Sequence, residues 1–208
     1  TKSFPAAFMR HDVSELVNFP TYGAVNISVD VVKKLSPDAY SLFEFKSEAE
    51  TIVLEKIFEF PVLSEWRKNG NLHLSREYNA ADDDFRFNGN GKGYRIYEGK
   101  MMWHFTSYFA EPEKWISETE FKKTHFFEKG DWQKYRIAIR RVSASTNERT
   151  LVTTVLPKNT MTSHSLFVNV TDILTGIESV YLTSILNSFV LDFVMRNQSN
   201  FQSRTFFP

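Results

Sequence analysis

The stretch Tyr135-Arg136-Ile137-Ala138-Ile139-Arg140 alternates along the chain with the period of a β-strand. A β-branched run, Thr150-Leu151-Val152-Thr153-Thr154-Val155-Leu156, follows it and ends at Pro157. The residues between the two runs, 143 to 149, are polar and typical of a loop. We therefore predict two neighbouring strands joined by this loop.

The N-terminal part of the chain contains one strand pattern and one helix pattern. Residues 25–31 alternate apolar and polar side chains, which predicts a half-buried strand. Ser47 followed by Glu50 resembles a capping box, and apolar residues then fall on one helical face. A helix is therefore predicted from about Glu48 to Phe60.

The C-terminal part repeats apolar residues at helical spacing, which predicts one largely buried helix from near Ile177 to Arg196. Together the patterns predict a single α/β domain with a mixed, mainly antiparallel sheet and packed helices. Residues 67–208 are interpreted as its core and residues 1–66 as a small lobe at a junction with another domain.

The composition excludes some classes of protein and leaves others open. The 208-residue chain has 25 Lys and Arg against 25 Asp and Glu, a balance that disfavours a nucleic-acid binder. The positive excess is C-terminal, since residues 131–208 carry eight basic against five acidic residues. A domain that is held on DNA by a partner domain needs little more positive charge than this.

The chain has no cysteine, which excludes disulfides and thiolate metal sites and fits a reducing cytoplasm, the location that we expect. Its longest apolar run is too short to span a bilayer. The first residue is Thr1 and the last residues are apolar, so we expect a piece of a longer polypeptide.

The strand pair supplies the best candidate binding residues. Arg136 and Arg140 share one strand face, and Arg141 follows them. The loop adds Asn147, Glu148 and Arg149, and these side-chain types contact phosphates and base edges in DNA complexes. The alternative is an ordinary solvated strand face with a polar hairpin loop.

A nuclease pattern is also present in its barest form. Asp38, Glu44 and Lys46 match two acids that hold Mg²⁺ and a lysine that assists water. The pattern is short and degenerate, so we attribute it to chance. The five histidines are scattered without metal spacing, and no metal site is expected.

Three blocks of sequence resemble the C-terminal target-recognition region of Taq-like adenine-N6 DNA methyltransferases, including fused type II restriction-modification enzymes and related phage-defence methylases. The first is Ile96-Tyr97-Glu98-Gly99-Lys100-Met101-Met102-Trp103-His104-Phe105. The second is the arginine strand, the loop Ser145-Thr146-Asn147-Glu148-Arg149-Thr150 and the next strand. The third is Leu186-Asn187-Ser188-Phe189-Val190-Leu191-Asp192.

The resemblance implies a module that grips double-stranded DNA opposite a methyltransferase domain, whose cofactor is S-adenosylmethionine. The chain has neither the Asn-Pro-Pro-Tyr or Asp-Pro-Pro-Tyr tetrapeptide nor a glycine-rich cofactor loop, so it is expected to be catalytically inert and to bind no cofactor itself. The candidate DNA-binding residues are Lys100, Arg136, Arg140, Arg141, Asn147, Glu148, Arg149, Asn200 and Arg204.

A second hypothesis makes the chain a non-catalytic protein-interaction or carbohydrate-binding module, because it is neutral and rich in aromatic residues. A contiguous basic groove beside Arg140 would favour DNA recognition. An exposed aromatic platform without nearby arginines would favour the second hypothesis.

Overall fold

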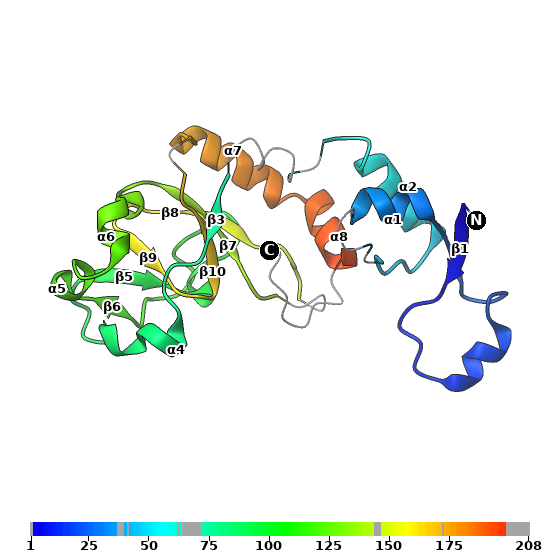
Figure 1. Ribbon diagram of the computed structural model, residues 1–208, viewed down its shortest axis with the longest axis horizontal. Coiled ribbons are helices and arrows are strands. Elements are labelled where there is room, and N and C mark those ends of the chain that lie inside the picture. Colours follow the sequence, from blue (N-terminus) through cyan, green and yellow to red (C-terminus); the bar gives the residue numbers. More distant parts are fainter. Residues whose placement is uncertain are drawn as a thin grey trace.

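The computed structural model describes residues 2–36, 40, 42–61, 63, 72–143, 147–171 and 173–198. The molecule is elongated, with two small sheets at one end and an N-terminal lobe at the other (Figure 1). Helices α7 (Gly176–Leu186) and α8 (Phe189–Gln198) run between the two ends. The expected mixed α/β fold is confirmed.

The first sheet has the strand order β3-β10-β7-β8 and is antiparallel throughout. Its strands are β3 (Leu74–Ser75), β10 (Leu166–Asn169), β7 (Arg136–Arg140) and β8 (Thr153–Leu156). The pairing of β7 with β8 runs from Arg136 opposite Leu156 to Ile139 opposite Thr153. The predicted strand pair is therefore confirmed, although β8 begins at Thr153 rather than at Thr150.

The second sheet has the order β4-β6-β5-β9, and its β5–β9 pair is parallel. Its strands are β4 (Phe87–Asn88), β6 (Trp115–Ile116), β5 (Tyr94–Tyr97) and β9 (Thr160–Thr162). Short helices complete this end of the molecule: α4 (Ala80–Asp83), α5 (Glu118–Phe121), α6 (His125–Lys129) and the 3-10 turns η2 (Asp84–Arg86), η3 (Gly99–Met101) and η4 (Asp131–Gln133).

Strand β7 is covered on both faces, which disagrees with the alternative of an ordinary solvated strand face. Ile137 and Ile139 pack in a core with α7 residues, whereas Ala138 packs in another core with Tyr97 of the second sheet. Arg136 and Arg140 share the face of Ala138, so they point between the two sheets rather than into open solvent.

Arg136 forms an ion pair inside the protein. Its side chain is 3% exposed, and its guanidinium lies 2.6 Å from the equally buried carboxylate of Glu77. It also donates to the backbone oxygen of Thr160 at 2.7 Å, while Glu77 accepts from the N–H and hydroxyl of Thr162. Arg136 therefore joins β7, β9 and the segment after β3, and it has no access to DNA in this structure.

The prediction of a single C-terminal helix is wrong, because the structure has two helices in this region. α7 and α8 meet at Asn187 and Ser188 with a bend of 58°. Asn187 turns its side chain to β8, and the Ser188 hydroxyl accepts from the N–H of Leu191 at the start of α8. Such side-chain bonds compete with a continuous helix.

These helices are also less buried than predicted, since Ile185, Phe189 and Val190 of the apolar repeat are exposed. Within the described residues, no single helix is long and apolar enough to cross a membrane. Only α7 and α8 taken together, across their bend, meet that test.

The N-terminal lobe pairs β1 (Ser3–Ala6) with β2 (Val25–Ser28) and packs α1 (Val29–Leu35) and α2 (Glu48–Ile57) against them. The predicted strand ends at Ser28, because its partner β1 begins opposite at Ser3, and the remaining valines enter α1. α2 is confirmed with its Ser47 cap, but it ends at Ile57, three residues earlier than predicted. Pro61 disfavours a helical conformation at the residue before it.

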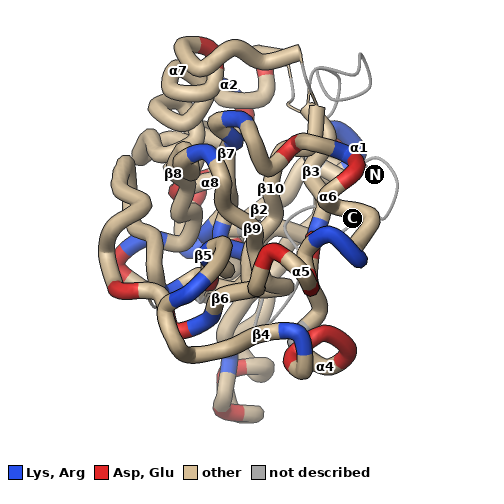
Figure 2. Tube along the Cα trace, turned by 90° about the vertical axis from the view of Figure 1, so that its left-hand side faces the viewer, with Lys and Arg blue, Asp and Glu red and all other residues tan. Residues whose placement is uncertain are grey.

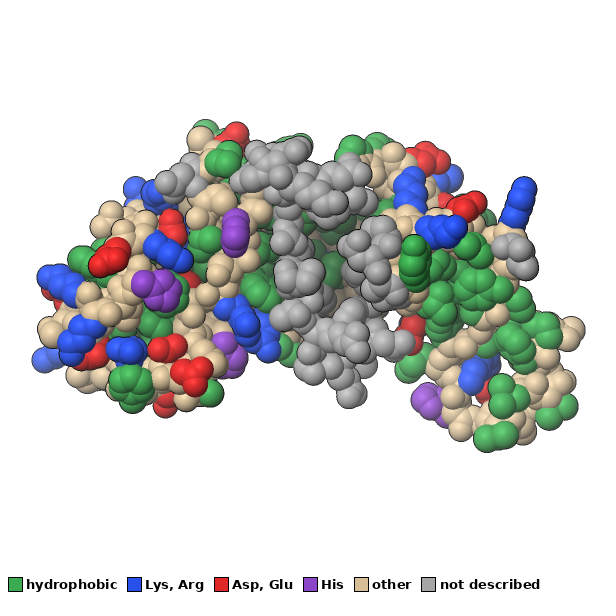
Figure 3. Space-filling view, viewed as in Figure 1, with side chains coloured by type: hydrophobic (Ala, Val, Ile, Leu, Met, Phe, Trp, Pro, Cys, Tyr) green, Lys and Arg blue, Asp and Glu red, His purple; other side chains and the backbone are tan. Residues whose placement is uncertain are grey.

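An arm between β1 and β2 projects from this lobe and contains the 3-10 helix η1 (Val13–Asn18) (Figures 1 and 3). Its apolar side chains are largely exposed, among them Val13, Leu16 and Val17. α8 closes the lobe from the other side, because Phe193 and Val194 pack in its core.

Replacing Glu77 with Gln is expected to destabilise the protein by about 3–5 kcal/mol, because Arg136 would keep a buried charge without its counterion. Urea unfolding measures this loss as a lower midpoint. Glu118→Gln is the matched control, since its ion pair with Lys122 is solvent-exposed and is expected to contribute little to stability. Equal midpoints for the two variants would contradict the structural role of the pair.

Candidate nucleic-acid interface

The three sequence blocks meet at one residue of the sheet edge, Thr153. The backbone N–H of Phe105 donates to the Thr153 oxygen at 3.4 Å, and the amide of Asn187 donates to the same oxygen at 2.9 Å. The Asn187 oxygen in turn accepts from the N–H and the hydroxyl of Thr153. Segments far apart in the chain are thus fixed against the first residue of β8.

Asp192 fixes the connection between β7 and β8 from the side of α8. One carboxylate oxygen accepts from the N–H groups of Thr150 and Leu151 at 2.7 and 2.9 Å. The other lies 3.4 Å from Arg149 and 3.3 Å from Arg196. A carboxylate that is this buried and this well bonded orders the backbone around it.

The loop residues Asn147 and Glu148 are held through their backbones. Arg196 donates to the oxygens of both residues, at 3.0 and 2.9 Å. The Asn147 side chain donates to the Ser143 hydroxyl at 3.0 Å. Arg149 pairs with Asp192 rather than with Glu148, so residues 147–149 are held in place by Asp192 and Arg196.

Arg140 has a guanidinium without a carboxylate partner among the described residues. It donates to the Met102 oxygen at 2.7 Å and lies 5.2 Å from the centre of the Trp103 ring. Its Nε is buried without a hydrogen-bond partner, and burial lowers the pKa of the side chain. A β-carbon at Gly99 would lie 3.4 Å from the Arg140 side chain, so the backbone at Gly99 packs closely beside Arg140.

Arg141 and Lys100 differ sharply in how well their charges are neutralised. Arg141 donates to the backbone oxygen of His164 at 3.2 Å and has no ion pair within the described ranges. Lys100 is paired with Glu113 and lies 3.5 Å from Glu98. The hydrogen bond with Glu113 raises the pKa of Lys100, so its charge is already compensated.

His104 lies next to Trp103, and its lowered pKa favours the neutral imidazole. Burial lowers its pKa, and the positive charges of Arg149 and Arg140 lower it further, against the opposing charges of Asp192 and Glu148. Its Nε2 is buried without a hydrogen-bond partner.

Arginines and aromatic rings lie next to one another near His104. Arg149 lies 4.5 Å from the ring centre of Phe189, which is 80% exposed, and Phe105 and Phe109 are also exposed. We call this surface the aromatic–arginine face: Trp103, Phe105, Phe109, Arg140, Arg149 and Phe189. Guanidiniums bind phosphates and aromatic rings contact bases, so the face has the chemistry of a nucleic-acid contact.

The structure brings together only part of the candidate set. Arg140, Arg149, Asn147 and Glu148 lie around the clamped loop, with Arg141 at the end of β7, whereas Arg136 is internal and Lys100 is neutralised. Asn200, Arg204 and Asp38 lie outside the described residues. Sequence reasoning missed Phe105 and Phe189 as candidate site residues, because nothing in the local sequence pattern shows that an aromatic side chain is exposed.

The surrounding charge is mixed. At the end of the molecule that faces the viewer in Figure 2, basic and acidic residues alternate along the trace. A surface of one sign, which would favour DNA directly, is not seen from this side. In the described part of the chain, no group of three or more His, Asp or Glu residues is placed to hold a metal ion.

An apolar groove lies on the outer side of α7 and β8. Exposed tyrosines dominate it, and its lining comprises Ser107, Tyr108, Tyr135, Val155, Pro157, Gly176, Ile177, Val180, Tyr181 and Ser184. None of these lining residues is charged. It therefore matches the aromatic platform that the second hypothesis requires.

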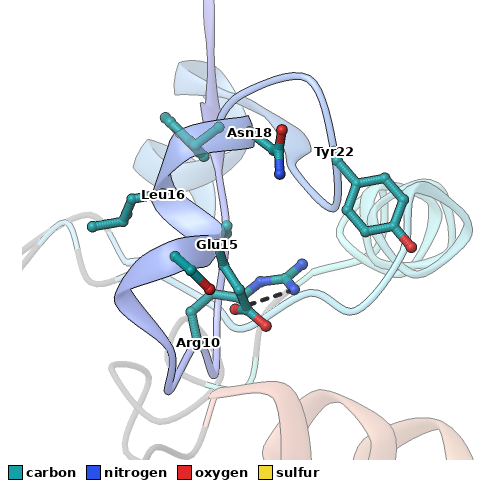
Figure 4. Close-up of a pocket in the computed structure, with 8 residues that line it drawn as sticks. Arg10, Glu15, Leu16, Asn18 and Tyr22 are labelled. Carbon is teal, nitrogen blue, oxygen red and sulfur yellow. Dashed lines mark ion pairs between the residues drawn. The ribbon is translucent and has the colours of Figure 1, made fainter.

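A smaller pocket lies in the N-terminal arm (Figure 4). Arg10 spans it, 3.5 Å from Glu15 and bonded to the Gly23 oxygen at 2.9 Å. The charge of Arg10 is therefore used within the arm, and the pocket offers no free cation.

Comparison with protein-family models, curated proteins and solved structures finds no match to this chain.

Replacing Asp192 with Asn is expected to destabilise the protein by roughly 2–4 kcal/mol, because Arg149 and Arg196 would lose their shared counterion. The measurement is the urea midpoint at constant m-value. Asp84→Asn, which breaks the exposed pair with Lys114, is the matched control and is expected to shift stability by under about 0.5 kcal/mol. A loss no larger than the control's would show that Asp192 does not hold the loop.

Proposed function

We propose that this chain is the DNA target-recognition module of a bacterial restriction-modification or phage-defence adenine-N6 methyltransferase. The observation that carries the proposal is the meeting of the three family-like blocks at Thr153, beside the uncompensated guanidinium of Arg140. Blocks that serve a shared binding surface are expected to lie together.

The charges near this point support duplex DNA as the ligand. Arg140 and Arg141 have carbonyl partners but no carboxylate partner within the described chain, so phosphates can supply the missing counter-charge. Asn147 and Glu148 are exposed on a loop whose backbone is fixed by Arg196. A fixed loop with polar side chains suits the reading of base edges.

In this proposal the methyl transfer belongs to another domain of the same polypeptide, which would bind S-adenosylmethionine. The present chain would then act by holding the duplex, in the cytoplasm, against that domain. The mixed charge of the sheet end in Figure 2 fits a module that does not bind DNA alone with high affinity.

The test is fluorescence anisotropy of labelled duplex DNA over a salt series. The double variant Arg140→Gln/Arg141→Gln is expected to bind at least about tenfold more weakly, with a salt slope smaller by about 0.9 for each lost phosphate contact. Lys100→Gln is the matched control, because Glu113 and Glu98 already neutralise Lys100, and it is expected to bind like wild type.

The assay is run on the chain and on its full-length parent, with folding of each variant checked by circular dichroism. Binding by neither protein would contradict DNA recognition. Equal losses for the double variant and for Lys100→Gln would contradict the assignment of the contact to the end of β7.

The second candidate function is protein interaction, and the uncharged groove on α7 favours it. Ile177, Tyr181 and Ile185 are spaced by one helical turn and are all exposed. A second copy running antiparallel would place Tyr181 opposite Tyr181 and Ile177 opposite Ile185, so the stripe is self-complementary, as a two-fold interface requires.

This second function predicts self-association that Tyr181→Glu abolishes, measured by sedimentation velocity over a wide concentration range. Tyr22→Glu, at an equally exposed tyrosine in the N-terminal arm, is the control and is expected to associate like wild type. A monomer at all concentrations would leave no support for a self-associating groove.

A further inference from the structure

Phe105 lies at the tip of a tight turn in a backbone conformation that aromatic residues rarely adopt. Trp103 and Thr106 exchange two backbone hydrogen bonds, at 3.0 and 3.2 Å, and leave His104 and Phe105 as the tip. The φ of Phe105 is 61°, whereas His104 is not among the residues with positive φ. The second tip position of such a turn usually holds glycine or asparagine.

Burial does not explain the presence of Phe at this position, because the side chain is 63% exposed. Met9 and Tyr40 share positive φ and high exposure, but both belong to the N-terminal part of the chain. Phe105 is the one of these residues that lies on the aromatic–arginine face. An exposed and strained residue at a candidate site is grounds for a functional hypothesis.

The turn is fixed by contacts with β8, Phe109 and Arg140. The N–H of Phe105 is bonded to Thr153, and the Trp103 ring stacks on Phe109 at 5.6 Å with an angle of 26°. The Arg140 guanidinium lies over the Trp103 ring. Trp103 is thus engaged by Phe109 and by Arg140, so Phe105, rather than Trp103, is the ring offered to a ligand.

The surroundings of Phe105 select the kind of ligand. An apolar protein surface would cover Arg140 without giving it a counter-charge, which is unfavourable. A nucleic-acid duplex has phosphates outside and stacked bases inside, so it matches a cation that lies beside an apolar tip. Proteins that distort DNA use apolar wedges of this kind between base steps.

We propose that Phe105 is a wedge that enters the base stack of duplex DNA, while Arg140 holds a phosphate beside it. This inference rests on the proposed function and adds to it the way in which the duplex is engaged. The module would locally unstack a base step in addition to contacting base edges and phosphates.

The test is permanganate oxidation of thymines in a long mixed-sequence duplex, because permanganate attacks thymines that are unstacked. Wild type at saturating concentration is expected to raise thymine reactivity several-fold. Phe105→Gly is compared at a concentration that saturates the same DNA by anisotropy, and it is expected to leave thymine reactivity at the level of free DNA.

Phe85→Ala is the matched control, since Phe85 is 75% exposed and has Arg86 at 4.6 Å from its ring centre, but lies on η2. It is expected to behave like wild type. A melting temperature is measured for each protein. Phe105→Gly is expected to melt at or above the wild-type temperature because glycine relieves the strained φ, whereas a residue with a merely structural role would lower it.

The outcomes separate the two proposals. DNA binding without increased thymine reactivity, or with an increase that Phe105→Gly retains, would overturn the wedge and leave DNA recognition standing. Absence of DNA binding by the chain and by its parent would overturn DNA recognition, and the wedge with it. Binding with reactivity that is lost only in Phe105→Gly supports both.

Discussion

The buried carboxylate of Asp192 is the interaction on which the C-terminal half of the structure depends. It bonds the two N–H groups that precede β8, neutralises Arg149 and Arg196, and so ties the loop after β7 to α8. α8 in turn packs against the N-terminal lobe through Phe193 and Val194. Through α8, Asp192 therefore connects the edge strand β8 to the N-terminal lobe, and the candidate interface lies beside Asp192.

The strand pair, its loop and the start of α2 could be predicted from the sequence, because alternation and capping are local signals. The burial of Arg136 could not, since it depends on Glu77 and a second sheet that come from elsewhere in the chain. The break at Asn187 was missed for the same reason, because apolar spacing continues through it while its side chain bonds to Thr153. Candidate residues chosen by type thus included both an internal ion-pair partner and exposed loop residues.

Net charge is a poor guide to binding here, because much of the positive charge is used inside the molecule. Arg136 is matched by Glu77, Arg149 by Asp192 and Lys100 by Glu113. Arg140 and Arg141 donate to backbone carbonyls and have no carboxylate partner among the described residues. A chain of zero formal charge can therefore present a local cationic site, and its affinity would come from a few contacts on a prearranged surface.

A turn at Phe105 that is already formed in the free protein would benefit the complex that we propose. A left-handed conformation costs roughly 1–2 kcal/mol for such a residue. If the turn formed only on binding, that cost would weaken the complex by about tenfold, since 1.4 kcal/mol is a factor of ten in Kd. The hydrogen bonds to Thr153 and between Trp103 and Thr106 hold the turn in the free protein, so the cost falls on folding stability and leaves the affinity for a ligand intact.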